Sequence, residues 1–283
     1  MAIANAVTIQ ADGRILICGQ IPSSSDFPVA AIARYNTNGS LDTSFGTAGV
    51  VTATQLGAGL NAIAVQSDGK ILVAAPPGGA IVLVGRFNSN GTLDSTFGDS
   101  GVFTSKAPIS SSGPSGGIVI QSNGDILVAE GLLLRLLGSG QLDSSFGSGG
   151  YATTAGYVPS GLAVLANGKI LVSSAILSNP SSGGYVSRYS SNGSLDVSFG
   201  INGQLASPGP ANGIALLSGG NFLISGSLTS SLTGPTTGFA VSRYLGAGIT
   251  DSTFATHGGA VAPVPTYTII MTSGQGFNRA ATL

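Results

Sequence analysis

The sequence predicts an all-β protein built from tandem repeats, and three observations carry this prediction. A phrase of the form Leu-Asp-x-Ser-Phe-Gly, as in "LDTSFG" and "LDSSFG", recurs along the chain. Upstream of each copy, an Asp-Gly, Asn-Gly or Gly-Gly pair separates two short apolar runs. No segment of useful length has the periodicity of an amphipathic helix. Recurrence at about 50 residues is typical of architectures in which one small unit stacks on the next.

Five full repeats follow one another, at about residues 5–60, 61–116, 117–161, 162–213 and 214–265. The tail, residues 266–283, resembles the first part of a repeat and is predicted to be the opening hairpin of a sixth unit, with Gly274–Gly276 as its turn. Because each unit of a repeat protein packs on its neighbours, we expect a single domain over residues 1–283.

Each repeat predicts four short strands. The first two flank the Asp-Gly or Asn-Gly pair, a strong hairpin signal because both central positions of such a turn favour positive φ. The third ends in Arg and usually an aromatic residue, as in "AIARY", and the Leu-Asp-x-Ser-Phe-Gly phrase leads into a fourth, such as "GVVTAT". Four strands per unit is the composition of a propeller blade. We predict a β-propeller of five four-stranded blades with an extra C-terminal hairpin; the alternative is a partial six-bladed ring.

The Arg that ends each third strand lies eight positions before the Asp of its own repeat. The pairs are Arg34 and Asp42, Arg86 and Asp94, Arg135 and Asp143, Arg188 and Asp196, and Arg243 and Asp251. A turn near the midpoint of this spacing brings the two side chains within reach of a charge-assisted hydrogen bond. A ring of ligand-binding carboxylates is one interpretation. We favour one structural Arg–Asp brace inside each blade, because a repeated fold needs every brace.

The Phe of the recurring phrase allows two interpretations as well. Exposed aromatic rings would form a stacking platform for sugars or bases, whereas rings buried between blades would recur once per unit for packing, which we favour. The residues are Phe45, Phe97, Phe146, Phe199 and Phe254. The Gly after each Phe is expected at a positive φ, and Ala255 takes its place in the fifth repeat.

The combination "QSDGKILVA … RFNSNGTLDSTFG" resembles the delta-60 repeats, a family of tandem units in bacterial, mostly exported or surface-associated proteins that look like β-propellers. The resemblance covers essentially the whole chain. It implies a propeller fold and an extracellular or cell-surface location, and no common activity or set of functional residues. The first residues, "MAIANAVTIQ", show no signal-peptide pattern and read directly into the first strand.

Composition argues against several function classes. Charged residues are 7% of the chain and the net charge is −1, so a basic footprint for nucleic acid is missing. No apolar run approaches the ~20 residues needed to span a bilayer, so membrane insertion is not expected. Cys18 and His257, the single cysteine and histidine, cannot build the usual zinc sites, and we predict no metal and no cofactor. We interpret His257 as a solvated loop residue rather than part of a hydrolytic triad.

These observations favour a non-enzymatic binding or adhesion module. The connections between second and third strands vary freely, as at residues 20–27 and 227–238, and are rich in Ser, Thr, Gly and Pro. We expect this variable loop face to bind a protein or a glycan, because recognition usually resides in loops on a rigid scaffold. One alternative is a structural subunit of a surface assembly, with self-association through weakly charged faces. Another is a glycan-active enzyme with a site in the central channel.

Overall fold

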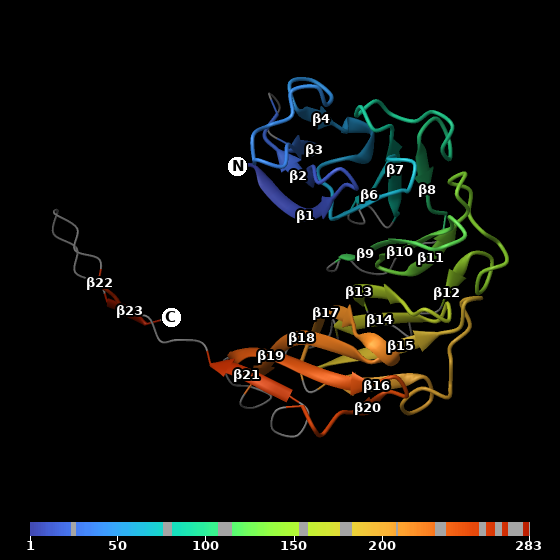
Figure 1. Cartoon of the computed structure of the whole chain (residues 1–283), viewed down its shortest axis with the longest axis vertical. Helices are drawn as coiled ribbons and strands as arrows, with labels where there is room; N and C mark the ends of the chain where they lie inside the picture. Colours follow the sequence, from blue (N-terminus) through green and yellow to red (C-terminus); the bar gives the residue numbers. More distant parts are fainter. Residues whose placement is uncertain are drawn as a thin grey trace.

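The computed structural model describes the chain in eleven segments, almost entirely of β-structure (Figure 1). They are residues 1–23, 27–75, 81–106, 115–152, 158–175, 183–207, 209–229, 236–254, 259–263, 268–270 and 280–282. Two single-turn 3-10 helices, Thr54–Leu56 and Ser218–Gly220, are the only helices in these segments. No helix of the described residues is long and apolar enough to cross a membrane.

Five antiparallel sheets follow in chain order, which confirms the predicted all-β propeller of five blades. The first blade holds β1 (Ile3–Ile9), β2 (Ile15–Ile21), β3 (Val29–Tyr35) and β4 (Val50–Thr52). The second holds β5 (Ala62–Val65), β6 (Ile71–Ala75), β7 (Leu83–Phe87) and β8 (Val102–Thr104). The third holds β9 (Ser115–Ile120), β10 (Ile126–Glu130), β11 (Leu133–Leu136) and β12 (Tyr151–Ala152). The fourth holds β13 (Val158–Val164), β14 (Ile170–Ala175), β15 (Gly184–Tyr189) and β16 (Gln204–Ser207).

The fifth blade holds β17 (Ala211–Leu216), β18 (Phe222–Thr229), β19 (Thr236–Leu245), β20 (Ile249–Thr250) and β21 (Gly259–Pro263). Both β20 and β21 pair with β19. The pairing of Val241 with Ala260 matches that of Ile32 with Val51 in the first blade, so β21 is the fourth strand of its blade. The short β20 takes the place of the single bridge between Tyr35 and Leu41.

Four of the five repeats begin slightly earlier in the structure than the sequence predicted. β1, β9, β13 and β17 begin before the predicted repeat starts at residues 5, 117, 162 and 214, which therefore fall inside these first strands. A structural unit begins with its innermost strand rather than near the turn motif.

The turns between first and second strands differ from the prediction in one respect. Gly13 and Gly69 have φ of 83° and 82°, but neither Asp12 nor Asp68 has a positive φ. The amide of Gly13 donates to the carbonyl of Gln10, and Asp12 Oδ1 accepts a hydrogen bond from the amide of Arg14 at 3.0 Å. These turns are longer than the expected two-residue hairpin loop, so glycine alone takes the left-handed conformation.

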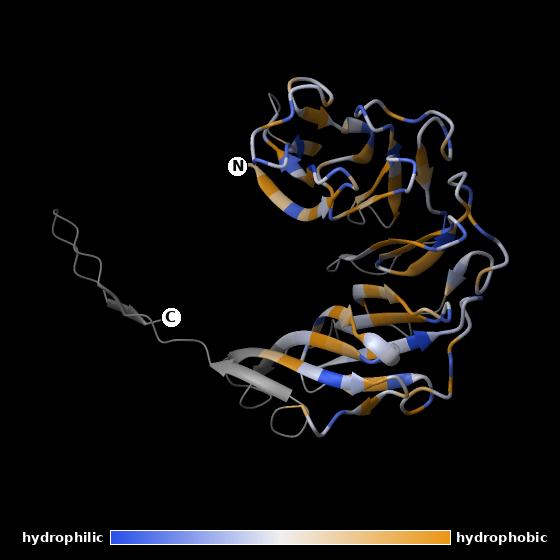
Figure 2. Ribbon diagram, viewed as in Figure 1, coloured by the Kyte–Doolittle hydropathy of each residue, from blue (hydrophilic) through white to orange (hydrophobic). Residues whose placement is uncertain are grey.

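The hydrophobic core is divided among the interfaces between successive blades. Leu16, Cys18 and Phe45 of the first blade pack against Ile71 and Val73 of the second, and three similar clusters fill the next three interfaces. Figure 2 shows this as apolar colour along the inner strands of every blade. The second, third and fourth sheets are therefore buried on both faces, the first and fifth on the one face that meets a neighbour, and a blade depends on adjacent blades for its stability.

The five blades form an open arc, with the first and fifth blades at its two ends (Figure 1). Innermost strands contact in the order β1, β5, β9, β13 and β17. The predicted alternative, a partial six-bladed ring, stays a prediction. In the tail, β22 (Thr268–Ile270) pairs with β23 (Ala280–Thr282), as the predicted hairpin requires, and this pair joins none of the five sheets. Its expected turn at Gly274–Gly276 lies outside the described residues.

Candidate functional site

The structure brings every predicted Arg–Asp pair together inside its own blade. The Arg Nε to Asp Oδ2 distance is 2.8 Å for Arg34 and Asp42 and 2.7 Å for Arg86 and Asp94. The other three pairs, Arg135 and Asp143, Arg188 and Asp196, and Arg243 and Asp251, are 2.6, 2.7 and 2.7 Å apart. In all five, the amide of the Asp donates to the carbonyl of the Arg, so the backbone itself positions the two side chains.

Four of these arginines also reach the next blade, which the expectation of a brace internal to one blade missed. Nη1 of Arg86 donates to the carbonyl of Gly138 and Nη1 of Arg135 to that of Ser191, each at 2.6 Å. Arg34 and Arg188 make the same bond to Ser89 and Gly246. The spacing within one repeat carries no information about the carbonyl of the following repeat, so the sequence alone did not reveal this contact.

Each Phe of the recurring phrase lies beneath the guanidinium of its own blade. The Arg34 Cζ is 4.5 Å from the centre of the Phe45 ring, and the other four blades show distances of 4.6–4.8 Å. Phe45, Phe97, Phe146 and Phe199 are fully buried, whereas Phe254 is partly exposed. Gly91, in the turn of the second blade, packs on the Phe45 ring, as the equivalent glycines do at the later interfaces.

Hydrogen bonds favour the charged form of the aspartates. Lys169 and Ser198 lower the pKa of Asp196, with Arg188 adding to their effect. At Asp94, burial raises the pKa, but hydrogen bonds from Thr96 and Lys70 outweigh it and lower the pKa overall. Lys70 and Lys169, each directly after a turn glycine, were not among the residues that the sequence singled out. The "DGK" and "NGK" triplets place a second cation at these aspartates.

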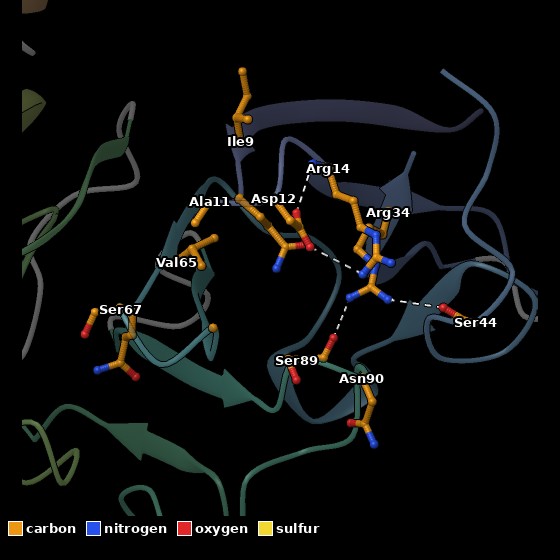
Figure 3. A pocket seen from close by; sticks show the side chains of 13 residues that line it. Ile9, Ala11, Asp12, Arg14, Arg34, Ser44, Val65, Ser67, Ser89 and Asn90 are labelled. Carbon is orange, nitrogen blue, oxygen red and sulfur yellow. Dashed lines mark hydrogen bonds and ion pairs between the residues drawn. The ribbon is translucent and has the colours of Figure 1, made fainter. Parts of the chain in front are cut away.

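A polar hollow of about 620 Å³ lies between the first and second blades (Figure 3). Asp12, Arg14 and Ser44 come from the first blade, and Ser67 and Asn90 from the second. Arg14 is 3.4 Å from Asp12 and 3.5 Å from Asp42, so its charge is shared between two carboxylates. None of the described lining residues is aromatic. The hollow therefore offers hydroxyl, amide and paired ionic groups without a large excess charge.

This hollow opens on the face that carries the recurring turns. That face is formed by the turns between first and second strands and by the Leu-Asp-x-Ser-Phe-Gly connections, and the Arg14–Asp42 contact joins the two. The predicted binding loops belong to the opposite face. Residues 24–26 and 230–235 of these loops lie outside the described residues, as do His257 and Ala255, so their predictions stay predictions.

Cys18 is a small buried residue of the core. It lies in β2 at the interface with the second blade, with 1% of its surface exposed. Burial raises the pKa of its thiol to about 12. The described residues contain no group of three or more His, Cys, Asp or Glu side chains placed to hold a metal ion.

Comparison with known proteins points to the same fold. Residues 10–45, 66–97 and 165–199 match a family described as "Domain of unknown function (DUF5122) beta-propeller". These segments span turn motifs, Arg–Asp pairs and buried phenylalanines of the first, second and fourth blades. No curated protein sequence matches the chain. The match supports a tandem β-propeller repeat, and the finer resemblance to delta-60 repeats remains a prediction.

Solved structures resemble the chain at low sequence identity. The PQQ-bound aldose sugar dehydrogenase from Streptomyces coelicolor has a TM-score of 0.53 and 14% identity, over 87% of this chain and 78% of that chain. Puromycin hydrolase gives 0.48 and 13%, over 99% and 42% of the two chains. The tail fiber of Staphylococcus aureus phage P68 gives 0.38 and 13%, over 87% and 48%. The chain spans less than half of the latter two. The likeness to the dehydrogenase extends to the fold alone: this chain is an all-β propeller of five four-stranded blades.

Proposed function

We propose that the protein is a non-enzymatic binding module that holds a neutral, hydroxyl-rich ligand, such as a short glycan, in the hollow between its first two blades. The observation that carries this proposal is the polar lining of a hollow of about 620 Å³, a volume within the range of ligand sites. The Ser67 hydroxyl can donate to and accept from ligand hydroxyls, and the Asn90 side-chain amide can donate to them, whereas the Ser44 hydroxyl already donates to Asp42.

The ionic groups of the hollow favour a neutral ligand. Arg34 is bound to Asp42, Ser89 and Ser44, and Arg14 lies between two carboxylates. A phosphate or carboxylate ligand would compete with Asp12 and Asp42 for these cations. A sugar hydroxyl can donate to Asp12 and accept from Arg14 without separating the pair. Without an aromatic ring to stack on, binding depends on hydrogen bonds and a modest contact with Val65.

The variable loop face remains a second proposed surface, for a protein or glycan partner, because its loops differ between repeats while the scaffold does not. An extracellular or cell-surface location is also a proposal, supported by the resemblance to exported repeat proteins. Within this setting, the bound ligand would anchor the propeller to a glycan-bearing surface.

A glycan-array screen followed by calorimetric titration of the best oligosaccharide tests the proposal. Ser67→Trp fills the hollow, and Ser122→Trp is its matched control, because Ser122 holds the equivalent exposed turn position of the third blade. We expect Ser67→Trp to abolish binding and Ser122→Trp to preserve it.

Two results would overturn the proposal. Binding that survives Ser67→Trp but is lost when residues 20–27 and 227–238 are replaced by Gly-Ser turns would place the ligand on the loop face. Chromatographic detection of cleaved oligosaccharide after incubation with the wild-type protein, but not with Ser67→Trp, would make the hollow an active site.

A further inference from the structure

The two ends of the arc expose surfaces that every internal blade interface buries. Ile63 and Val65 of β5 pack against the core between the first and second blades. Val7 and Ile9 hold the same positions in β1, at the start of the arc, and are 65% and 68% exposed. The surface that a preceding blade would cover is thus open at the first blade.

The rest of this end surface is apolar and hollowed. Ile17, Ala33 and Tyr35 line a hollow of about 330 Å³ on the outer side of the first blade. Their counterparts in the second blade are Val73, Gly85 and Phe87, of which Val73 is 0% and Phe87 1% exposed. The first-blade end surface therefore has the side chains of an internal interface but no blade against them.

The fifth blade exposes the other half of the same interface. The Arg243 side chain is 31% exposed, against 5–12% for the other four arginines. In the part of the chain that the structure describes, Nη1 of Arg243 lacks the carbonyl acceptor that its four counterparts find in a following blade. Ser225 is exposed, although Cys18 and Ser173 at the same position of earlier blades are 1% and 0% exposed.

The missing acceptors exist on the first blade. The carbonyl of Ser89 accepts from Arg34, and that of Asn90 accepts from the amide of Gly46. Thr37 and Asn38 hold these two positions in the first blade, and no described residue donates to their carbonyls. Gly39 is exposed with open space around it, whereas its counterpart Gly91 is buried on the Phe45 ring.

We propose that the fifth blade of one molecule binds the first blade of a second copy, head to tail, through the same contacts that join successive blades within the chain. Arg243 of one copy would donate to the Thr37 carbonyl of the other, and Phe254 would pack on its Gly39. The tail strands β22 and β23 pair with each other and join none of the five sheets. The contact is heterologous, so two copies close into a ring when the geometry permits and otherwise continue into an open chain.

Light scattering coupled to size-exclusion chromatography tests this contact with two blocked variants. Ile9→Asp places a charge on the first-blade end surface, and Ser225→Arg places a large side chain on the fifth-blade end surface. Ile201→Asp is the control, since Ile201 is 82% exposed away from both ends. All three positions are exposed, and circular dichroism verifies that each variant keeps its fold; Val7→Asp provides a second block of the first blade.

We expect the wild-type protein and Ile201→Asp to associate and each blocked variant to be monomeric. An equimolar mixture of Ile9→Asp and Ser225→Arg should form a dimer. The fifth blade of Ile9→Asp and the first blade of Ser225→Arg are both unblocked and can bind each other. A monomeric wild-type protein at the highest soluble concentration would overturn the proposal. So would association of both blocked variants, or a mixture that stays monomeric.

Discussion

Arg86 joins three parts of the molecule through one guanidinium. It binds Asp94 of its own blade, reaches the carbonyl of Gly138 in the next, and covers the ring of Phe97 with its Cζ 4.7 Å from the ring centre. Its side chain is 8% exposed. The spacing of eight residues was sufficient to predict the pair with Asp94. The bond to Gly138 depends on how two blades are placed, and no pattern within one repeat encodes that placement.

Replacing this arginine tests its role across the interface. Arg86→Ala leaves Asp94 buried with fewer partners, and we expect the free energy of unfolding to fall by about 3 kcal/mol. Arg243→Ala is the matched change at the end of the arc, where the side chain is more exposed and reaches no described neighbouring blade. It should cause a clearly smaller loss in urea-induced unfolding. Equal losses at both positions would mean that the interblade bond contributes nothing.

The lowered pKa of Asp196 makes stability depend on pH. Because Lys169 and Ser198 hold the folded-state pKa below its usual value of ~3.9, this carboxylate stabilises the fold above that value. The contribution is lost as pH falls through the folded-state pKa. We expect the urea midpoint of Asp196→Asn to lie below that of the wild-type protein at pH 7, and the difference to become smaller at pH 3 as the unfolded-state carboxyl takes up a proton. A difference that stays constant between these pH values would contradict this assignment.

At the scale of elements, the strands were predictable and the details of their turns were not. Alternation of apolar runs with Asp-Gly and Asn-Gly pairs located the hairpins, because few other residues tolerate the left-handed conformation. The predicted turn, with positive φ at both central positions, was wrong, since Asp12 keeps a negative φ and only Gly13 is left-handed. The polar hollow between the first and second blades is lined by turns about 55 residues apart in the sequence, so no single sequence motif indicates it.

Two glycines separate the roles of turn conformation and close packing. Gly98, in the recurring phrase of the second blade, has φ of 56°, and a Cβ there would lie 2.5 Å from the Val102 carbonyl oxygen. Gly124 has φ of 88° and open space around it. Both Gly→Ala changes strain the backbone, but only Gly98→Ala adds a steric clash. We expect it to cost about 1 kcal/mol more than Gly124→Ala in thermal or urea unfolding, and the reverse order would contradict the packing described here.

In the whole molecule, equivalent interfaces join successive blades, and each end of the arc exposes one half of such an interface. Repetition made the number of blades predictable, because each copy of the motif contributes one sheet. The curvature of the row was not predictable, since it depends on how side chains such as Leu16, Phe45 and Ile71 fill each interface. Whether five blades close into a ring follows from that curvature, and here they leave the first and fifth blades apart (Figure 1).

The distance between the two ends of one molecule distinguishes the open arc from a closed ring. Spin labels at Asn38 and Ile249, both exposed, report it by double electron–electron resonance, with Cys18 replaced by Ala and labels at Ser40 and Asn90 as the reference for an internal blade interface. After dilution with unlabelled protein, the open arc predicts a distance between Asn38 and Ile249 well above the reference. Any short distance seen before dilution should then disappear, because it arises between copies. A short distance that persists after dilution would show a closed five-bladed ring and contradict the open arc.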